Sequence, residues 1–97
     1  MPMYVALYKW TDKGIQNVKD APSRARAALK AAKAAGAKNL GVWFTEGPYD
    51  LVSVGEFADE NAAAAHALAV GSLGFVRTLS MRARTIDEFA EIIKMLP

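Results

Sequence analysis

The sequence contains no cysteine. A chain without thiols has no disulfides, no thiolate nucleophile and no cysteine ligands for a metal, so its fold must depend on packing alone. Such a chain suits a reducing compartment, and we expect it to be cytoplasmic. Histidine is almost as scarce, since His66 is the only one. We therefore expect no metal site, and the absence of a P-loop and of a dinucleotide glycine pattern predicts no cofactor.

Long hydrophobic runs and a strong charge of either sign are also missing. The uncharged stretch Ala62–Val76 has 15 residues, fewer than the roughly 20 that a membrane helix needs, and it includes His66 and Ser72. The first residues lack the basic start and the small-residue cleavage site of a signal peptide. A net charge of +2 is far below that of a nucleic-acid binder. We expect neither a membrane nor a nucleic acid as partner.

Large apolar side chains are fewer than the composition suggests. Of the 97 residues, 53% are hydrophobic, but 19 residues are alanine. The length predicts one domain over residues 1–97, and the alanine content predicts a thin core. A small chain with a thin core gains stability from a partner, so we expect a homodimer or a higher oligomer.

The hydrophobic pattern predicts an α+β fold. Aromatic and β-branched runs indicate four strands, over residues 3–10, 40–45, 51–57 and 75–84. Helix signals lie between Pro22 and Gly36, between an Asp59 N-cap and Gly71, and after a capping box at Thr85. The order β-α-β-β-α-β with a C-terminal helix is the ferredoxin-like plan, in which helices cover one face of a four-stranded antiparallel sheet.

The second helix has no polar side. Residues 62–70 carry no charge, whereas the first helix has a basic side formed by Arg26, Lys30 and Lys33, which we interpret as solvated. A helix that is apolar all round is buried all round, and one small subunit cannot do this. We expect a neighbouring subunit to cover it.

Several short motifs resemble those of the GYD domain family. They are Trp10-Thr11 at the end of the first strand, the hairpin Gly47-Pro48-Tyr49-Asp50, the turn Gly71-Ser72-Leu73-Gly74 before Val76-Arg77-Thr78, and the helix start Thr85 to Phe89. The resemblance covers nearly the whole chain. It implies a subunit of the dimeric α/β barrel type that pairs through its open sheet face, and it implies no particular reaction.

The strand directions predict that one set of candidate binding residues lies close together. The ferredoxin-like topology brings the ends of strands that carry Trp10, Glu46, Asp50 and Arg77 to one edge of the sheet. An aspartate beside Tyr49 and opposite an arginine could orient a ligand. The alternative is structural, with Asp50 capping the hairpin and pairing with Arg77.

A second set follows the first and last strands. Tyr4, Tyr8 and Trp10, beside Ser80 and Arg82, could line a cavity between two sheets or pack against a partner. His66 is the first candidate for general acid or base chemistry because only its side chain titrates near neutral pH. Its alternative role is that of a hydrogen-bonded histidine in a packed interface.

These observations favour a homo-oligomer that binds a small molecule, either in a pocket between sheet and helices or at the subunit interface. The enzymatic alternative is a cofactor-independent oxygenase or isomerase, which rests on the activities of other dimeric α/β barrels. Similarity of fold alone is a poor guide to function.

Overall fold

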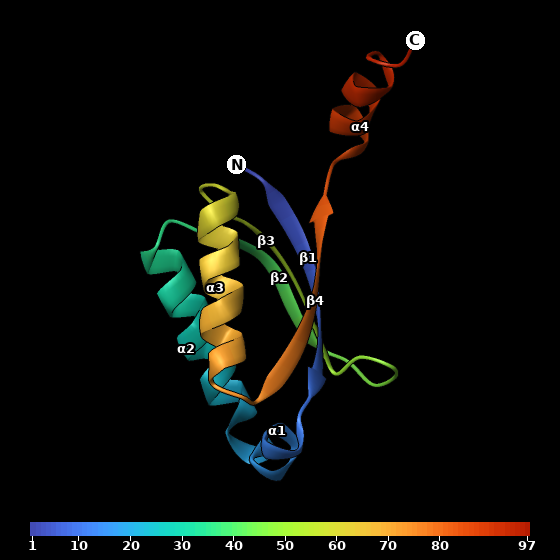
Figure 1. The fold of residues 1–97 in the computed structure, drawn as a ribbon. Coiled ribbons are helices and arrows are strands. Elements are labelled where there is room, and N and C mark those ends of the chain that lie inside the picture. Colours follow the sequence, from blue (N-terminus) through green and yellow to red (C-terminus); the bar gives the residue numbers. More distant parts are fainter.

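Four antiparallel strands form one sheet in the order β2-β3-β1-β4. The computed structural model describes residues 1–97 (Figure 1). The strands are β1 (Met3–Trp10), β2 (Lys38–Phe44), β3 (Leu51–Glu56) and β4 (Val76–Ala83). β1 lies at the centre and pairs with both β3 and β4. This order is that of the ferredoxin-like fold, and it confirms the predicted α+β topology.

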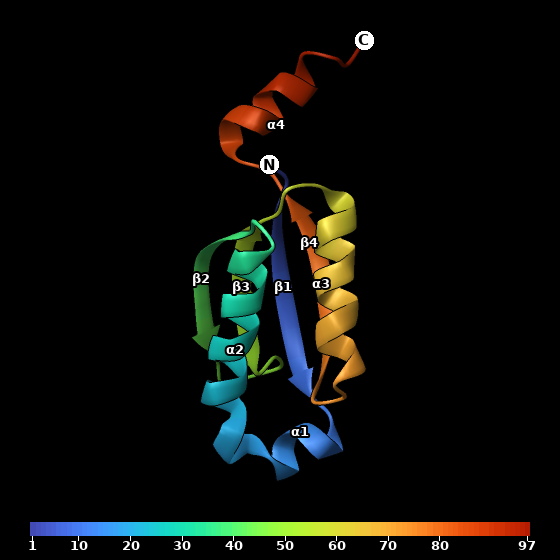
Figure 2. The ribbon, with the colours of Figure 1, turned by 90° about the vertical axis from the view of Figure 1, so that its left-hand side faces the viewer.

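Two long helices cover one face of this sheet. They are α2 (Ala21–Ala34) and α3 (Glu60–Ser72), which lie side by side in Figure 2. The other face carries no helix. The C-terminal helix α4 (Ile86–Ile93) extends past the end of β4, away from the sheet (Figure 1). None of the helices has the length and apolarity that crossing a membrane requires.

Local signals placed the ends of the helices correctly. Asp59 caps α3, because its Oδ1 accepts a hydrogen bond from the Ala62 N–H at 2.8 Å. The predicted capping box opens α4: Thr85 Oγ1 accepts from the Glu88 N–H, and the Glu88 carboxylate accepts from the Thr85 N–H. α2, the first of the predicted helices, ends at Ala34, slightly before the predicted stop at Gly36, whose φ is 91°.

A short helix between β1 and α2 was not predicted. It is α1 (Asp12–Gln16), which a 3-10 turn (Val18–Asp20) joins to α2. Five residues are too few for a helical hydrophobic period, so the sequence pattern indicated only a break in the strand. Tertiary contacts hold it: the Thr11 N–H donates to Phe75 O at 3.1 Å, and Thr11 Oγ1 caps the helix.

The strand register decides which side chains face the helices. Tyr8 lies between Leu51 on β3 and Thr78 on β4, and its hydroxyl bonds to Ser53. Tyr4 and Trp10 share this side of β1 because strand residues alternate. The prediction that this aromatic face lines a cavity between two sheets is wrong, because the face is turned towards α2 and α3.

The single chain has a thin core. Tyr8, Ala21 and Val76 are its buried hydrophobic residues. Large apolar side chains remain exposed on the uncovered sheet face, where Trp43 is 55% and Leu79 49% exposed, and on the outer side of α3, where Leu68 is 73% exposed. The alanine-rich helices explain the thin core, since their methyl groups do not fill the space above the sheet.

Candidate functional site

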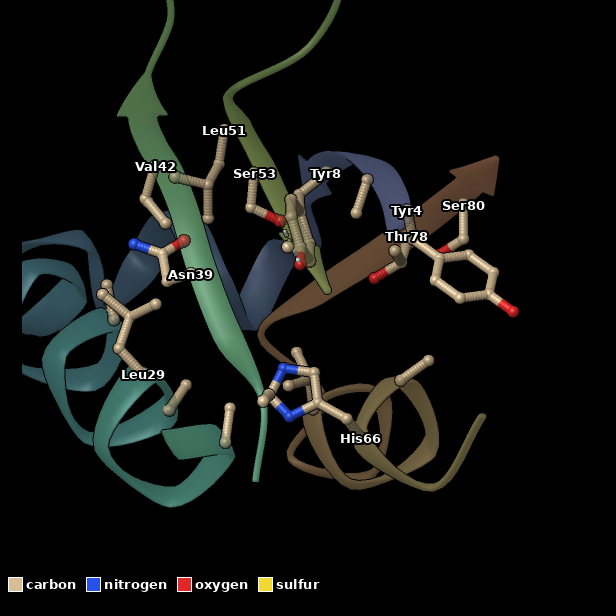
Figure 3. Close-up of a pocket in the computed structure, with 18 of the residues that line it drawn as sticks. Tyr4, Tyr8, Leu29, Asn39, Val42, Leu51, Ser53, His66, Thr78 and Ser80 are labelled. Carbon is tan, nitrogen blue, oxygen red and sulfur yellow. Dashed lines mark hydrogen bonds between the residues drawn. The ribbon is translucent and has the colours of Figure 1, made fainter. Parts of the chain in front are cut away.

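A large cavity lies between the sheet and helices α2 and α3. Its volume is about 800 Å³, within the range of roughly 300 to 1,000 Å³ that small-molecule pockets occupy. All four strands supply the floor, and alanines of both helices supply most of the opposite wall (Figure 3). Among these alanines are Ala25, Ala28, Ala32, Ala63 and Ala67. Short side chains on both helices leave the space open.

A group of hydroxyls occupies the floor of the cavity. Tyr8 Oη and Ser53 Oγ are 3.0 Å apart and hydrogen-bonded, although they come from different strands. Thr78 pairs with Tyr8 in the register, and Ser80 is the next residue of β4 on the same side. The Thr78 hydroxyl is buried without a hydrogen-bond partner. An otherwise apolar cavity therefore contains a small polar area that can orient a ligand.

His66 lies on the helix side of the cavity. Figure 3 shows its imidazole and the Tyr8 ring entering the cavity from opposite walls. The imidazole centroid lies 5.5 Å from that of Phe57. Burial lowers the pKa of His66 from its ordinary value of 6.5, because an apolar surrounding disfavours the charged imidazolium. The imidazole is thus neutral at pH 7 and can accept or donate a hydrogen bond.

Arg24 is a cavity residue that the sequence analysis missed. Its guanidinium carbon lies 3.9 Å from the centre of the Phe75 ring, and its Nη1 donates to Asn17 O at 2.8 Å. Its position on α2 was a usable signal: on a helical wheel it falls on the alanine side, opposite Arg26. Lys30 and Lys33 are exposed, as expected, and also border the cavity.

At the predicted rim of the sheet, Asp50 binds backbone groups of β1. Asp50 Oδ2 accepts a hydrogen bond from the Trp10 N–H at 2.8 Å, and the Asp50 N–H donates to Tyr8 O at 2.8 Å. Arg77 pairs with Lys9 in the register and is exposed. The single salt bridge of the structure joins Lys94 and Glu91, so Asp50 and Arg77 form no ion pair.

The remaining candidates lie outside the cavity lining. Lys9 Nζ lies over the Tyr49 ring, 5.3 Å from its centre. Glu46 is exposed in the β2–β3 turn. Arg82 lies over the Tyr4 ring at 5.9 Å and donates to Met3 O. Five of the candidates line the cavity, namely Tyr4, Tyr8, Trp10, His66 and Ser80, whereas Glu46, Tyr49, Asp50, Arg77 and Arg82 do not. The structure brings together no three His, Asp or Glu side chains that could hold a metal ion.

A comparison with known families shows the family of the chain. The family model described as GYD domain matches residues 4–93. The chain belongs to the GYD domain family. Neither the curated proteins nor the solved structures compared with this sequence gave a match.

The region matched to the GYD domain contains the whole cavity. All residues that line the cavity fall between Tyr4 and Ser80, inside the matched range. The match also includes all of α4, which extends away from the sheet and the cavity (Figure 1). The cavity is thus a feature of the GYD domain itself in this chain, built from its sheet and its two long helices.

Proposed function

We propose that this GYD domain binds a small, mainly apolar molecule in the cavity between its sheet and helices. The observation that carries the proposal is the cavity of about 800 Å³, which combines an alanine-rich wall with a few converging polar groups. Binding sites for small molecules have this composition, because apolar surface provides affinity and a few polar atoms fix orientation. Bulkier side chains on α2 and α3 would have produced a filled core instead.

A neutral fluorescent probe tests this proposal, and a pair of leucine variants locates the binding site. N-phenyl-1-naphthylamine becomes fluorescent in apolar sites. Ala28 lines the cavity, whereas Ala27 on the same helix is exposed and lies outside its lining. We expect saturable binding of one probe per chain, which Ala28→Leu weakens and Ala27→Leu leaves unchanged.

The opposite pattern would overturn the proposal. An equal affinity of the wild type and of Ala28→Leu for the probe would place the probe outside the cavity. An absence of saturable binding would mean that the cavity does not admit an apolar molecule.

The neutral His66 opposite Tyr8 favours a second candidate function, a cofactor-independent isomerase or oxygenase. Either reaction can begin with removal of a proton from the substrate, and a neutral imidazole is a suitable base. The Tyr8 hydroxyl, hydrogen-bonded to Ser53, could stabilise the resulting oxyanion.

Hydrogen–deuterium exchange tests the proton transfer without knowledge of the product. We expect the protein to accelerate exchange at the α-carbon of a small enolisable ketone such as 2-tetralone in D₂O, followed by NMR. His66→Gln should abolish the acceleration while probe binding remains. Equal exchange rates with and without the protein would exclude this candidate and leave the binding function intact.

We also propose that two copies associate through the uncovered sheet face. Val5, Leu7 and Leu79 lie side by side at the centre of this face, which makes it suitable for a two-fold contact of the same patch with itself. The projecting α4 offers further apolar surface, since Ile86 is 89% and Phe89 56% exposed. Contact with a second copy would remove both surfaces from water.

Sedimentation of two lysine variants tests this association. The wild-type protein should sediment at about twice the 10.4 kDa of the chain. Leu79→Lys, on the sheet face, should sediment as a monomer, whereas Leu68→Lys, on the outer side of α3, should remain a dimer. A monomeric wild type would refute the proposal, and dissociation by Leu68→Lys alone would move the interface to α3.

A further inference from the structure

Two buried polar atoms of the structure have no hydrogen-bond partner. They are Arg24 Nη2 and Thr78 Oγ1, and both residues line the same cavity. Buried polar groups in folded proteins are nearly always paired, because an unpaired donor has lost its water without compensation. Because both residues line the cavity, a small rotation of either side chain brings its free polar atom to a ligand in the cavity.

The surroundings of Arg24 show what that partner must supply. Nη1 donates to Asn17 O, and the guanidinium carbon lies over the Phe75 ring, so Nη2 is the amino group without a partner. No carboxylate of the chain forms a salt bridge with Arg24. Phe75 stands three residues before Thr78, which places the arginine close to the start of β4.

The charge balance of the cavity favours an anion. Its lining contains four cationic side chains, Arg24, Lys30, Lys33 and Lys38, but only two carboxylates, Glu56 and Glu60. Lys30, Lys33 and Lys38 are exposed, so solvent weakens their effect, whereas Arg24 and Glu56 are half-buried. Glu56 lies at the other end of the sheet from Arg24, because it pairs with Met3 at the start of β1, whereas Phe75 precedes Val76, which pairs with Trp10 at the end of β1. One half-buried cation matches one negative charge; a dianion such as a phosphate would leave surplus charge in an apolar space.

We propose that the ligand of this cavity is an apolar carboxylic acid, whose carboxylate accepts a hydrogen bond from Arg24 Nη2 and whose hydrocarbon part lies against the alanines of α2 and α3. Thr78 Oγ1 is a second hydrogen-bond donor to the acid group. The inference rests on the proposed binding function and adds the chemical class of the ligand. A charged hydrogen bond at a half-buried site is stronger than a neutral one, so the acid group supplies selectivity as well as affinity.

A matched pair of competitors tests the charge, and a matched pair of variants tests the residue. The competitors 4-phenylbutyrate and 4-phenyl-1-butanol have the same hydrocarbon part, and each is used to displace N-phenyl-1-naphthylamine. Arg24→Met removes the cavity arginine, and Arg26→Met removes an exposed arginine of the same helix that does not line the cavity. All measurements are made at one salt concentration.

We expect the acid to displace the probe from the wild-type protein at a concentration at least tenfold below that of the alcohol. Arg24→Met should weaken displacement by the acid at least tenfold and change the alcohol less than twofold, and Arg26→Met should change neither. Thr78→Val should weaken displacement of the probe by the acid more than displacement by the alcohol.

Three results would overturn the inference while leaving the binding function standing. These are equal or tighter binding of the alcohol to the wild-type protein, an equal loss of both compounds in Arg24→Met, and an equal loss of the acid in Arg26→Met. A wild-type protein that does not bind the probe at all would instead refute the binding function. If Arg24→Met does not fold, the wild-type preference for the acid and the Thr78→Val result still decide whether the ligand is an acid.

Discussion

Filling the cavity from the helix side should stabilise the unliganded protein. Ala28 lines the cavity on α2 and is half-buried, and replacement by leucine adds three carbon atoms that point into empty space. Each buried CH₂ contributes about 0.8 kcal/mol, and the ordering of a leucine side chain costs about 0.5 to 1 kcal/mol. Ala28→Leu should therefore raise the free energy of unfolding by about 1.5 kcal/mol.

The neighbouring position provides the control. Ala27 is exposed and does not line the cavity, and leucine is nearly as good a helix former as alanine, so Ala27→Leu should change little. For a domain of this size, about 1.5 kcal/mol corresponds to a rise of roughly 6 to 12 °C in Tm. The assay is thermal unfolding followed by circular dichroism, together with probe titration. Ala28→Leu should also weaken probe binding.

Some outcomes would refute this reasoning. If Ala28→Leu lowers Tm, the space is already filled in solution and the added carbons overpack the core. If both leucine variants bind the probe as the wild type does, the probe does not occupy the cavity.

Three further predictions concern single positions. Gly14→Ala should destabilise the protein by about 1 to 3 kcal/mol in urea unfolding, because the added Cβ would overlap the Phe75 carbonyl. Gly71→Ala has open space around it and should stabilise the protein by up to about 1 kcal/mol. Equal effects of the two variants would contradict the packing of α1 against Phe75. Burial lowers the pKa of His66, so on acidification the unfolded chain takes up the proton before the folded protein does. The free energy of unfolding should therefore fall as the pH drops through 6.5 and level off below the folded-state pKa. A His66→Gln variant with the same pH dependence of stability would refute this cause. Thr85→Ala removes the cap of α4 and should cost that helix about 1 kcal/mol, seen as roughly fivefold faster amide exchange in Ile86–Ile93; unchanged protection would show that the cap is unimportant.

Much of the fold was readable because its signals are local. β1 begins and ends where its aromatic and branched run does, and the caps at Asp59 and Thr85 act through side chains only three residues from the amides they bind. The pattern also identified the uncharged α3 and the short supply of large core residues. Both properties belong to stretches of chain that need no information about distant residues.

The candidate site was only partly readable. The sequence placed Tyr8 and Trp10 on one side of β1 and singled out His66, and all three line the cavity. It gave equal weight to the hairpin residues, where Asp50 instead holds the Trp10 amide. Strand order brings such residues to the same edge, but it does not determine which backbone groups their side chains bind.

The sequence by itself determined the order of the elements, because helix and strand periods, caps and turn residues act over a few neighbouring positions. Only the tertiary structure decided what lies between the elements. The distance from the sheet to α2 and α3 depends on how side chains from both layers fill the gap, and here the alanines leave it open. Tertiary packing also leaves Nη2 of Arg24, otherwise one more arginine of a basic helix, buried without a hydrogen-bond partner beside this space.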